Sequence, residues 1–526
     1  MRHSASPMPS PFFHTPLRAL ASLAAAAFAL SCNSGTAGDR STQTERSRAV
    51  AAATSASATP AGSGADGYAP PLPVGSYPSP QARIQQWINQ GNTSAIRAHA
   101  WDIWASITAA TSDKTQPTWQ TWYSGHELFE MDGGVRLRAR APRGRVEFEA
   151  PVMFGHRPAL ARPADGSIPY DPAERVFAFN RFTQSTASFI WQKHLWSGDF
   201  LRDTNNAFTK RGTPLVSRAI LTSRDSTDSA SFVIKTVFQF ISGSEVTAVP
   251  YWAGDSAAVT TEPLNPIPAK WRQAVAVDPS GKHQPGDSVF LPVNNDGPKW
   301  LKVVPMSAFY WIRITAEDSA HLSMFGAANG DFIGVANDTS LQAVMMAVRP
   351  GNVGLLMAMH VTGKEIPNWT WQTFWWGFNP QDSAYGRDRP ATIPAPWNHY
   401  NMNVAYSMVT PEGKPLVAFN PYLETSLAGV IPNGRSPKDS LSWTGVTTNC
   451  MSCHRRAAWG WADGQYIPQL YGPAANVDPG DPVIFTQPVP GGPPGKRVPL
   501  LKTDFLWSIV VRAHPPTSGA VVPVKQ

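Results

Sequence analysis

The chain is poor in cysteine: its 526 residues contain three, at positions 32, 450 and 453. A structural zinc site normally needs four ligands and often uses two cysteine pairs. One close pair and one isolated thiol near the N-terminus do not meet that requirement. A disulfide between Cys450 and Cys453 would close only a very short loop. The scarcity of cysteine therefore disfavours a zinc module and a disulfide staple, and it leaves the close pair to be explained.

Charged residues are also scarce. They make up 15% of the chain, below the usual fraction of roughly a quarter, so Ser, Thr, Asn, Gln, Pro and Gly must cover much of the surface. The formal net charge is +7, and it becomes +5 (7 − 2) without residues 1–31, which hold Arg2 and Arg18 but no acid. No Lys/Arg cluster is interleaved with aromatics, so nucleic-acid binding is not expected. A weakly basic surface favours docking to an acidic redox partner.

Long helices are disfavoured by fifty prolines and forty glycines. These residues favour short strands, turns and ordered loops. With 42% hydrophobic residues and twenty tryptophans, the chain has ample apolar material for a globular core. We therefore expect an irregular, loop-rich fold of the α+β or mostly-β class, with helices near the N-terminus and many short strands in one large body.

One apolar run lies near the N-terminus, and it is too short for a transmembrane helix. No other stretch of the sequence is long and apolar enough to cross a bilayer. This run, residues 19–30, follows two arginines and leads to small residues, which is typical of a secretion signal over residues 1–31. Its end, Ala-Leu-Ser-Cys, resembles a bacterial lipobox and predicts lipidation at Cys32. Cleavage after Ala29 is the alternative and leaves a free thiol. We expect export to the periplasm, or an outer-membrane location through a lipid anchor.

Residues 32–78 are rich in Ser, Thr, Ala and Gly and nearly free of large apolar side chains. Such a segment cannot bury enough surface to offset its chain entropy, so it is expected to be a disordered tether. Residues 79–526 show no internal repeat and no clear division, and are expected to form a single globular body. Ser79 and Pro80 suit a helix start. A second helix is expected at 94–108, and strands at 135–140, 232–241, 300–305, 308–315, 343–348 and 355–361.

Residues 450–454 read Cys-Met-Ser-Cys-His, the C-x-x-C-H pattern to which haem c is attached. The two thiols add to the two vinyl groups on one edge of the porphyrin, and the following histidine reaches the iron. A shift of one residue would direct the imidazole away from the metal. The pattern predicts one covalent haem c, held by Cys450 and Cys453 and ligated by His454, in an attachment segment at 440–475.

A thioredoxin-like redox pair is an alternative interpretation of the two neighbouring cysteines. Such a pair lies at a helix start after a strand, whereas here a loop rich in Pro, Gly and Ser precedes the motif. Export favours haem, because bacterial haem attachment takes place outside the cytoplasm. The cysteine count agrees with this interpretation: one thiol for a lipid and two for the porphyrin.

The second axial ligand of the iron is not fixed by the sequence. Small cytochromes c usually take a methionine downstream of the motif, but no methionine follows Met451, and His514 is the only histidine there. The upstream candidates are His399, Met402, Met408 and His360. Each of them can also be a core methionine or a hydrogen-bonded histidine. A filled site favours outer-sphere electron transfer, whereas an open iron would bind small ligands.

The C-x-x-C-H motif resembles that of the c-type cytochromes, and further segments resemble exported bacterial monohaem proteins with a long N-terminal body. These segments are 117–123 (Pro-Thr-Trp-Gln-Thr-Trp-Tyr), 360–364 (His-Val-Thr-Gly-Lys), 367–374 (Pro-Asn-Trp-Thr-Trp-Gln-Thr-Phe) and 420–425 (Asn-Pro-Tyr-Leu-Glu-Thr). Relatives often carry a histidine directly after Thr-Phe, where this chain has Trp375 and Trp376. The resemblance implies haem binding and electron transfer, and no substrate. Read without it, Trp369, Trp371 and Phe374 are core or haem-wall residues.

Three functions are compatible with these observations. The leading one is electron transfer by a c-type cytochrome of the bacterial cell envelope, with a redox protein as partner. The second is a haem enzyme of the peroxidase or oxidase kind, which needs an open iron and a nearby acid or base; Glu424, His399 and His360 are the candidates. The third is a surface lipoprotein whose aromatics bind glycans and whose haem is structural. The sequence assigns no catalytic residue.

Overall fold

The computed structural model describes residues 78–114, 116–129, 148, 153–154, 176–220, 231–252, 273–293, 297–328, 348–414, 416–423, 449–455, 457–460, 486–488 and 497–514. Within these residues, helices accompany four separate β-sheets. The fold is α+β, irregular and rich in short strands, as the composition predicts.

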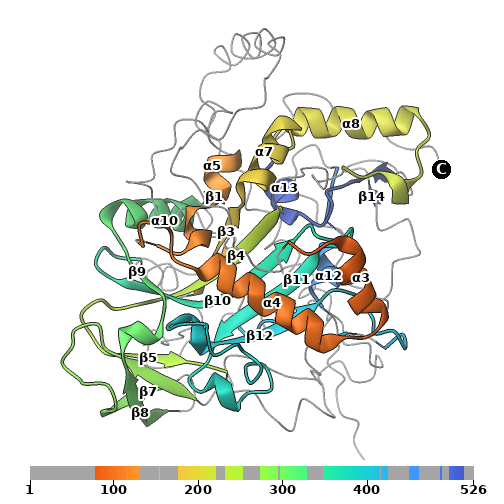
Figure 1. The fold of residues 1–526 in the computed structure, drawn as a ribbon. Coiled ribbons are helices and arrows are strands. Elements are labelled where there is room, and N and C mark those ends of the chain that lie inside the picture. Colours follow the sequence, from red (N-terminus) through yellow and green to blue (C-terminus); the bar gives the residue numbers. More distant parts are fainter. Residues whose placement is uncertain are drawn as a thin grey trace, which may run out of the picture.

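The largest sheet runs through the middle of the molecule (Figure 1) and has eight strands, all paired antiparallel. The strand order is β1–β3–β4–β10–β11–β12, with β2 beside β3 and β9 beside β10. The bounds are β1 Tyr123–Ser124, β2 Met153–Phe154, β3 Val176–Phe182, β4 Phe232–Ile241, β9 Trp311–Arg313, β10 Val353–Gly363, β11 Thr370–Trp376 and β12 Tyr400–Ala405. The long strands β4 and β10 pair at its centre, so distant parts of the chain build the sheet together.

Helices α3 (Gln81–Asn89) and α4 (Thr93–Thr108) pack beside this sheet, and α4 crosses one face of it over β10, β11 and β12 (Figure 1). The Asn92 side chain caps α4 by accepting the Ala95 N–H at 3.0 Å. Trp104 of α4 stacks on Phe374 of β11, with ring centroids 4.2 Å apart. Buried apolar side chains from α4, β4, β10 and β11 surround this pair, so the α4 face is the main apolar core of the molecule.

The opposite face of the sheet is covered by several shorter helices. They are α5 Gly125–Phe129, α7 Gln184–Gln192, α8 Gly198–Lys210, α12 Cys450–His454 and α13 Trp507–Arg512. Their apolar residues pack with Phe182, Val233 and Trp371 of the sheet. Two small antiparallel pairs belong to the C-terminal part of the chain: β13 (Ala458–Trp459) with β16 (Leu501–Lys502), and β14 (Thr486–Pro488) with β15 (Arg497–Pro499). The C-x-x-C-H sequence therefore lies on the face opposite α4.

A smaller sheet with its own apolar cluster lies at one end of the molecule (Figure 1). It has the order β5–β6–β8–β7, and β6 and β8 pair parallel. Its strands are β5 Thr247–Pro250, β6 Ala274–Val277, β7 Ser288–Pro292 and β8 Pro298–Val304.

The remaining described elements are one helix and several short turns. Helix α10 spans Ala316–Ala328. The 3-10 turns occur at Thr118–Thr121, Leu215–Ser217, Met306–Ala308, Pro380–Asp382 and Trp397–His399.

The strongest sequence patterns are confirmed. The strands predicted at 232–241, 300–305 and 355–361 fall on β4, β8 and β10, and the helix predicted at 94–108 is α4. In the 308–315 segment only Trp311–Arg313 is a strand, because a 3-10 turn precedes it. Helix α3 begins at Gln81 with Pro80 at its cap position, so the predicted cap at Ser79 is wrong; the Ser79 N–H donates to the Glu365 carboxylate instead.

Several predictions fall on residues that the structure does not describe. These are the signal (1–31) with Cys32, the tether (32–78) apart from its last residue, the strand at 135–140, and most of 343–348 and 440–475. Among the described residues, no helix combines the length and the apolar character that crossing a membrane requires.

Candidate functional site

Helix α12 consists of the five residues of the C-x-x-C-H motif. Positions three and four residues apart lie on one side of a helix, so positions 450, 453 and 454 share a side of the α12 backbone. Cys450 is buried, and it belongs to the apolar cluster of Trp371 on β11. A single helical turn therefore holds the three positions of the motif on one side, which is the spacing that haem c attachment requires.

Asn449, immediately before α12, holds the helix in place through three hydrogen bonds. Its Oδ1 accepts the Met451 N–H at 3.1 Å, as a cap at a helix start does. Its Nδ2 donates to the carbonyl oxygens of Ser407 and Leu416, at 3.1 Å and 2.9 Å. Asn449 is buried, so these bonds are shielded from water and join α12 to the loop that follows β12.

The ring of His454 is fixed on two sides. Its Nδ1 lies 2.8 Å from the carbonyl oxygen of Phe505, and its ring centroid lies 4.5 Å from that of Trp371. A carbonyl oxygen only accepts hydrogen bonds, so the proton of the neutral imidazole is on Nδ1 and the lone pair is on Nε2. Histidines that bind a metal commonly have this arrangement, because a hydrogen bond at one nitrogen orients the ring and sets the tautomer.

The three aromatic residues that the sequence singled out as core or haem wall separate in the structure. Trp369 and Trp371 belong to the cluster that contains Cys450. Phe374 belongs to the core under α4, where it stacks on Trp104. The alternation of side chains along β11 explains the difference. Trp371 is the residue of the three that contacts His454, so it is the candidate wall residue.

The four candidate distal ligands also divide between the two faces of the sheet. Met408 packs against the cluster of Cys450 and Met451, and it follows Ser407, whose carbonyl oxygen binds Asn449. Met402 is fully buried in the core on the α4 side. His399 lies on that side as well, because its ring stacks on Trp376 of the same core with 6.0 Å between centroids.

His399 has the features of a core histidine. Burial lowers its imidazole pKa, hydrogen bonding at Gly377 acts in the opposite direction, and the charge of Arg389 lowers the pKa further. The ring is therefore neutral at neutral pH and packs against the indole of Trp376. The 3-10 turn at Trp397–His399 directs it there.

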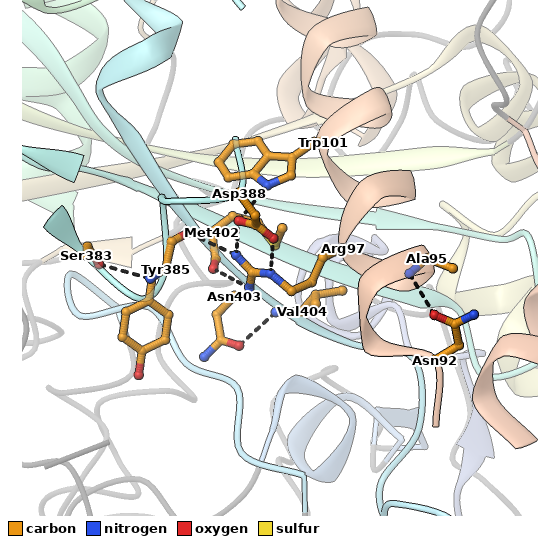
Figure 2. A network of polar contacts seen from close by, with 10 residues as sticks. All are labelled: Asn92, Ala95, Arg97, Trp101, Ser383, Tyr385, Asp388, Met402, Asn403 and Val404. Carbon is orange, nitrogen blue, oxygen red and sulfur yellow. Dashed lines mark hydrogen bonds and ion pairs between the residues drawn. The ribbon is translucent and has the colours of Figure 1, made fainter. Parts of the chain in front are cut away.

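Met402 is held in place by a polar network that ties α4 to β12 (Figure 2). Arg97 donates to both oxygens of Asp388, at 2.5 and 2.6 Å, and to the carbonyl oxygens of Met402 and Tyr385 at 3.2 Å. The Trp101 indole N–H donates to Asp388 at 3.2 Å. Burial works against ionisation of Asp388, but the hydrogen bonds and charge of Arg97 and the bond from Trp101 lower its carboxyl pKa. The network fixes α4 against the Met402 backbone of β12.

His360 belongs to a row of polar residues on the α12 face. Strand register places five polar side chains side by side across the sheet: Asn180, Lys235, His360, Thr373 and Asn403. The rows on either side contain Trp371 and Trp375 and are mostly apolar. Four of the five residues in the row are partly exposed. The sequence shows each polar residue but not the row, because the row depends on the register of five strands.

Of the three acid–base candidates, Glu424 lies outside the described residues, while His399 and His360 lie on opposite faces of the sheet. Sequence reasoning missed Asn449 and the carbonyl of Phe505, since neither belongs to a recognisable motif. His514 forms an isolated bridge with Ser197 beside α8 and stacks edge-on against Trp196. Among the described residues, no three His, Cys, Asp or Glu side chains gather as a metal cluster.

Comparison with protein families, with curated proteins and with solved structures finds no match to this chain.

Proposed function

We propose that this chain binds one covalent haem c through Cys450, Cys453 and His454 and transfers electrons. The observation that carries the proposal is the hydrogen bond from His454 Nδ1 to the Phe505 carbonyl at 2.8 Å. It leaves Nε2 as the metal-binding atom of the imidazole, and the helical turn of α12 holds positions 450, 453 and 454 on one side. The iron of a bound haem would take four of its ligands from the porphyrin, so a single histidine beside the two cysteines is compatible with this role.

The residues around the motif have separate parts in this proposal. Cys450 and Cys453 would each form a thioether bond, and His454 would ligate the iron. The Phe505 carbonyl orients the His454 ring and raises its basicity. The Trp371 indole covers one side of the same ring and keeps water away from it. When bound, the haem supplies one-electron redox chemistry, whose potential depends on these neighbours and on the distal ligand.

Met408 is the distal ligand that we propose. It is the candidate that packs against the apolar cluster to which Cys450 and Met451 belong, and the Asn449 bonds to Ser407 and Leu416 hold its loop beside α12. His360 is the second candidate, because it lies on the same face of the sheet, in the row next to that of Trp371. A thioether ligand would raise the potential of the iron relative to a second imidazole.

The cellular setting remains the one that the sequence predicts. We propose that the protein is exported to the periplasm or anchored to the outer membrane by a lipid at Cys32. We also propose that it exchanges electrons with another redox protein. The weakly basic composition favours an acidic partner. Electron transfer is preferred to peroxidase or oxidase chemistry because the loop of Met408 would fill the distal position.

The test is production of the exported chain together with a haem-maturation system. We expect a pyridine haemochrome spectrum with one haem per chain, and a porphyrin retained on the polypeptide after acid and solvent unfolding. The Cys450→Ser/Cys453→Ser double variant should lose the bound porphyrin. Cys32→Ser is the matched control, since it removes a thiol outside the motif and should keep the haem. Wild-type protein with no retained porphyrin would end the proposal.

Carbon monoxide tests the distal assignment. The reduced wild-type protein should bind it slowly or not at all, whereas Met408→Ala should bind it rapidly and show an altered Soret band. Met402→Ala is the control, because Met402 lies in the core on the other face. Rapid binding by the wild type would favour the haem-enzyme alternative. An effect of His360→Ala in place of Met408→Ala would assign the ligand to His360.

A further inference from the structure

A buried polar triad lies on the α4 side of the sheet, away from the cysteine motif. It joins Glu365, which follows β10, to His99 of α4 and to Tyr406, which follows β12. The exposed fractions are 7%, 2% and 2%, respectively. Groups of this kind are costly to bury unless each finds partners. The hydrogen bonds within the triad therefore show which proton positions the fold supports.

The hydrogen-bond directions in the triad can be assigned from the chemistry of each atom. Tyr406 Oη lies 2.6 Å from His99 Nδ1 and accepts the Gln372 amide N–H at 2.9 Å. A lone pair at His99 Nε2 would face the carboxylate oxygen Glu365 Oε1, so Nε2 carries the imidazole proton and Nδ1 accepts the phenol proton of Tyr406. Nε2 lies 3.1 Å from Glu365 Oε1, within ion-pair distance though not aligned for a linear hydrogen bond.

Both carboxyl oxygens of Glu365 accept further hydrogen bonds. Its Oε1 accepts the Ser79 backbone N–H at 3.0 Å, and its Oε2 accepts the Thr370 hydroxyl at 2.8 Å. Hydrogen bonds donated to a carboxylate favour its charged form. An imidazolium at His99 would therefore form a buried ion pair with this carboxylate, whereas a neutral His99 leaves the negative charge compensated by hydrogen bonds alone.

The triad makes one way of oxidising Tyr406 easier than the others. Burial raises the pKa of the Tyr406 phenol well above its ordinary value, the charge of Glu365 raises it further, and the hydrogen bond from Gln372 opposes this in part. Loss of the proton alone would place a phenolate beside a carboxylate. Loss of an electron alone would leave a buried, strongly acidic radical cation. Loss of both leaves a neutral radical, while the proton converts His99 to the imidazolium that Glu365 stabilises.

Trp87 of α3 connects this triad to the surface. Its ring lies 5.6 Å from that of His99, which in turn lies 5.7 Å from the Tyr406 ring. Trp87 is partly exposed and packs against the small cluster formed by Ile84, Ile366 and Tyr406. An oxidant at the surface can therefore withdraw an electron through one indole without entering the core.

We propose that Tyr406 is a redox-active tyrosine, with His99 as its proton acceptor, Glu365 as the counter-ion and Trp87 as its contact with a one-electron oxidant. In the forward step, one electron leaves the phenol for the oxidant and the Oη–H proton moves to His99 Nδ1, which gives a neutral tyrosyl radical and an imidazolium. Return of one electron and the same proton restores the phenol. The step needs no group from α12, so it stands or falls separately from haem binding.

The test is flash oxidation of the full-length protein with photogenerated ruthenium(III) tris-bipyridine, followed by electron paramagnetic resonance. We expect a persistent tyrosyl signal that is lost in Tyr406→Phe. Tyr400→Phe is the matched control: Tyr400 is fully buried as well, but its hydroxyl donates to the Leu356 carbonyl at 2.7 Å, which cannot accept the proton. His99→Gln should lower the radical yield on the order of 10²-fold, the usual effect of losing a positioned base.

Isotope labelling of the wild-type protein provides a readout that does not depend on how the variants fold: ring-deuterated tyrosine should narrow the radical signal. Among the variants, Trp87→Phe should lower the yield of the radical without changing the shape of its signal. Near-ultraviolet circular dichroism would check that each variant keeps its tertiary packing. The proposal is overturned if the wild-type protein gives no persistent tyrosyl signal, or if folded Tyr406→Phe protein keeps the signal at the wild-type level.

Discussion

The two faces of the central sheet differ in how they are covered. On the α4 face, two helices that adjoin in the sequence and the aromatic side chains of the sheet form a continuous apolar core. On the α12 face, short helices from four separate parts of the chain surround a row of polar side chains and the cysteine motif. The α4 face gives a continuous apolar core and also holds the buried triad of Tyr406, while the other face brings the cysteine motif and the loop of Met408 together. The haem binding that we propose therefore uses the face that is assembled from more segments.

The largest effect should come from the α4 face. Trp104→Ala removes a fully buried indole that stacks on Phe374, so the free energy of unfolding should fall by about 3–5 kcal/mol. Denaturant titration of the purified protein measures this change. Trp300→Ala is the control, since Trp300 is 71% exposed on β8 and its loss should change stability by less than about 0.5 kcal/mol. Equal losses from both variants would contradict the assignment of the core.

A smaller effect is expected where α12 is fixed. Asn449→Ala removes three hydrogen bonds and leaves two carbonyl oxygens without that donor, so stability should fall by about 2 kcal/mol. The same variant should carry less covalent haem, because the helix and the loop of Met408 would no longer be aligned. Absorbance per chain measures the haem content. Unchanged haem content in a folded Asn449→Ala protein would show that haem attachment does not depend on the alignment of α12 with that loop.

The network of Figure 2 gives a pH-dependent effect of about 1 kcal/mol or less, because the Asp388 side chain is 40% exposed. Since folding lowers the pKa of Asp388, the pair contributes stability above the unfolded pKa of about 3.9 and loses it as the pH falls through the folded pKa. The difference in melting temperature between wild type and Asp388→Asn should therefore be present at pH 7 and shrink in acid. If the difference in melting temperature grew in acid instead, the assigned direction of the Asp388 pKa shift would be wrong.

The smallest effect should come from the polar row on the α12 face. Lys235→Met replaces a partly exposed side chain in β4 and should change the free energy of unfolding by about 0.5 kcal/mol or less. Thr236→Lys is the contrasting variant, since the next residue along the strand is buried on the α4 face and should tolerate no charge. Thermal unfolding of both proteins compares the two faces one residue apart. Similar losses would mean that the row is packed as tightly as the core.

Local patterns in the sequence predict the elements well and their positions poorly. Alternation predicts β4 at 232–241, and apolar periodicity predicts α4, because both signals lie within one segment. The distal candidates could not be ranked, since Met402 and Met408 are six residues apart in the sequence but pack into different clusters. Neither could the partner of His454 be named: Phe505 contributes a backbone carbonyl, which any residue carries.

The sequence by itself determined the spacing of Cys450, Cys453 and His454, on which the proposed haem attachment depends, because thioether and axial bonds require groups at fixed positions within five residues. It also determined the α+β character and the main strands, because these follow from composition and local periodicity. Tertiary structure alone decided which side of the sheet each candidate occupies and brought Tyr406 to His99 across 307 residues of chain. The reason is that side-chain direction and long-range pairing depend on register between distant strands, which no local segment specifies.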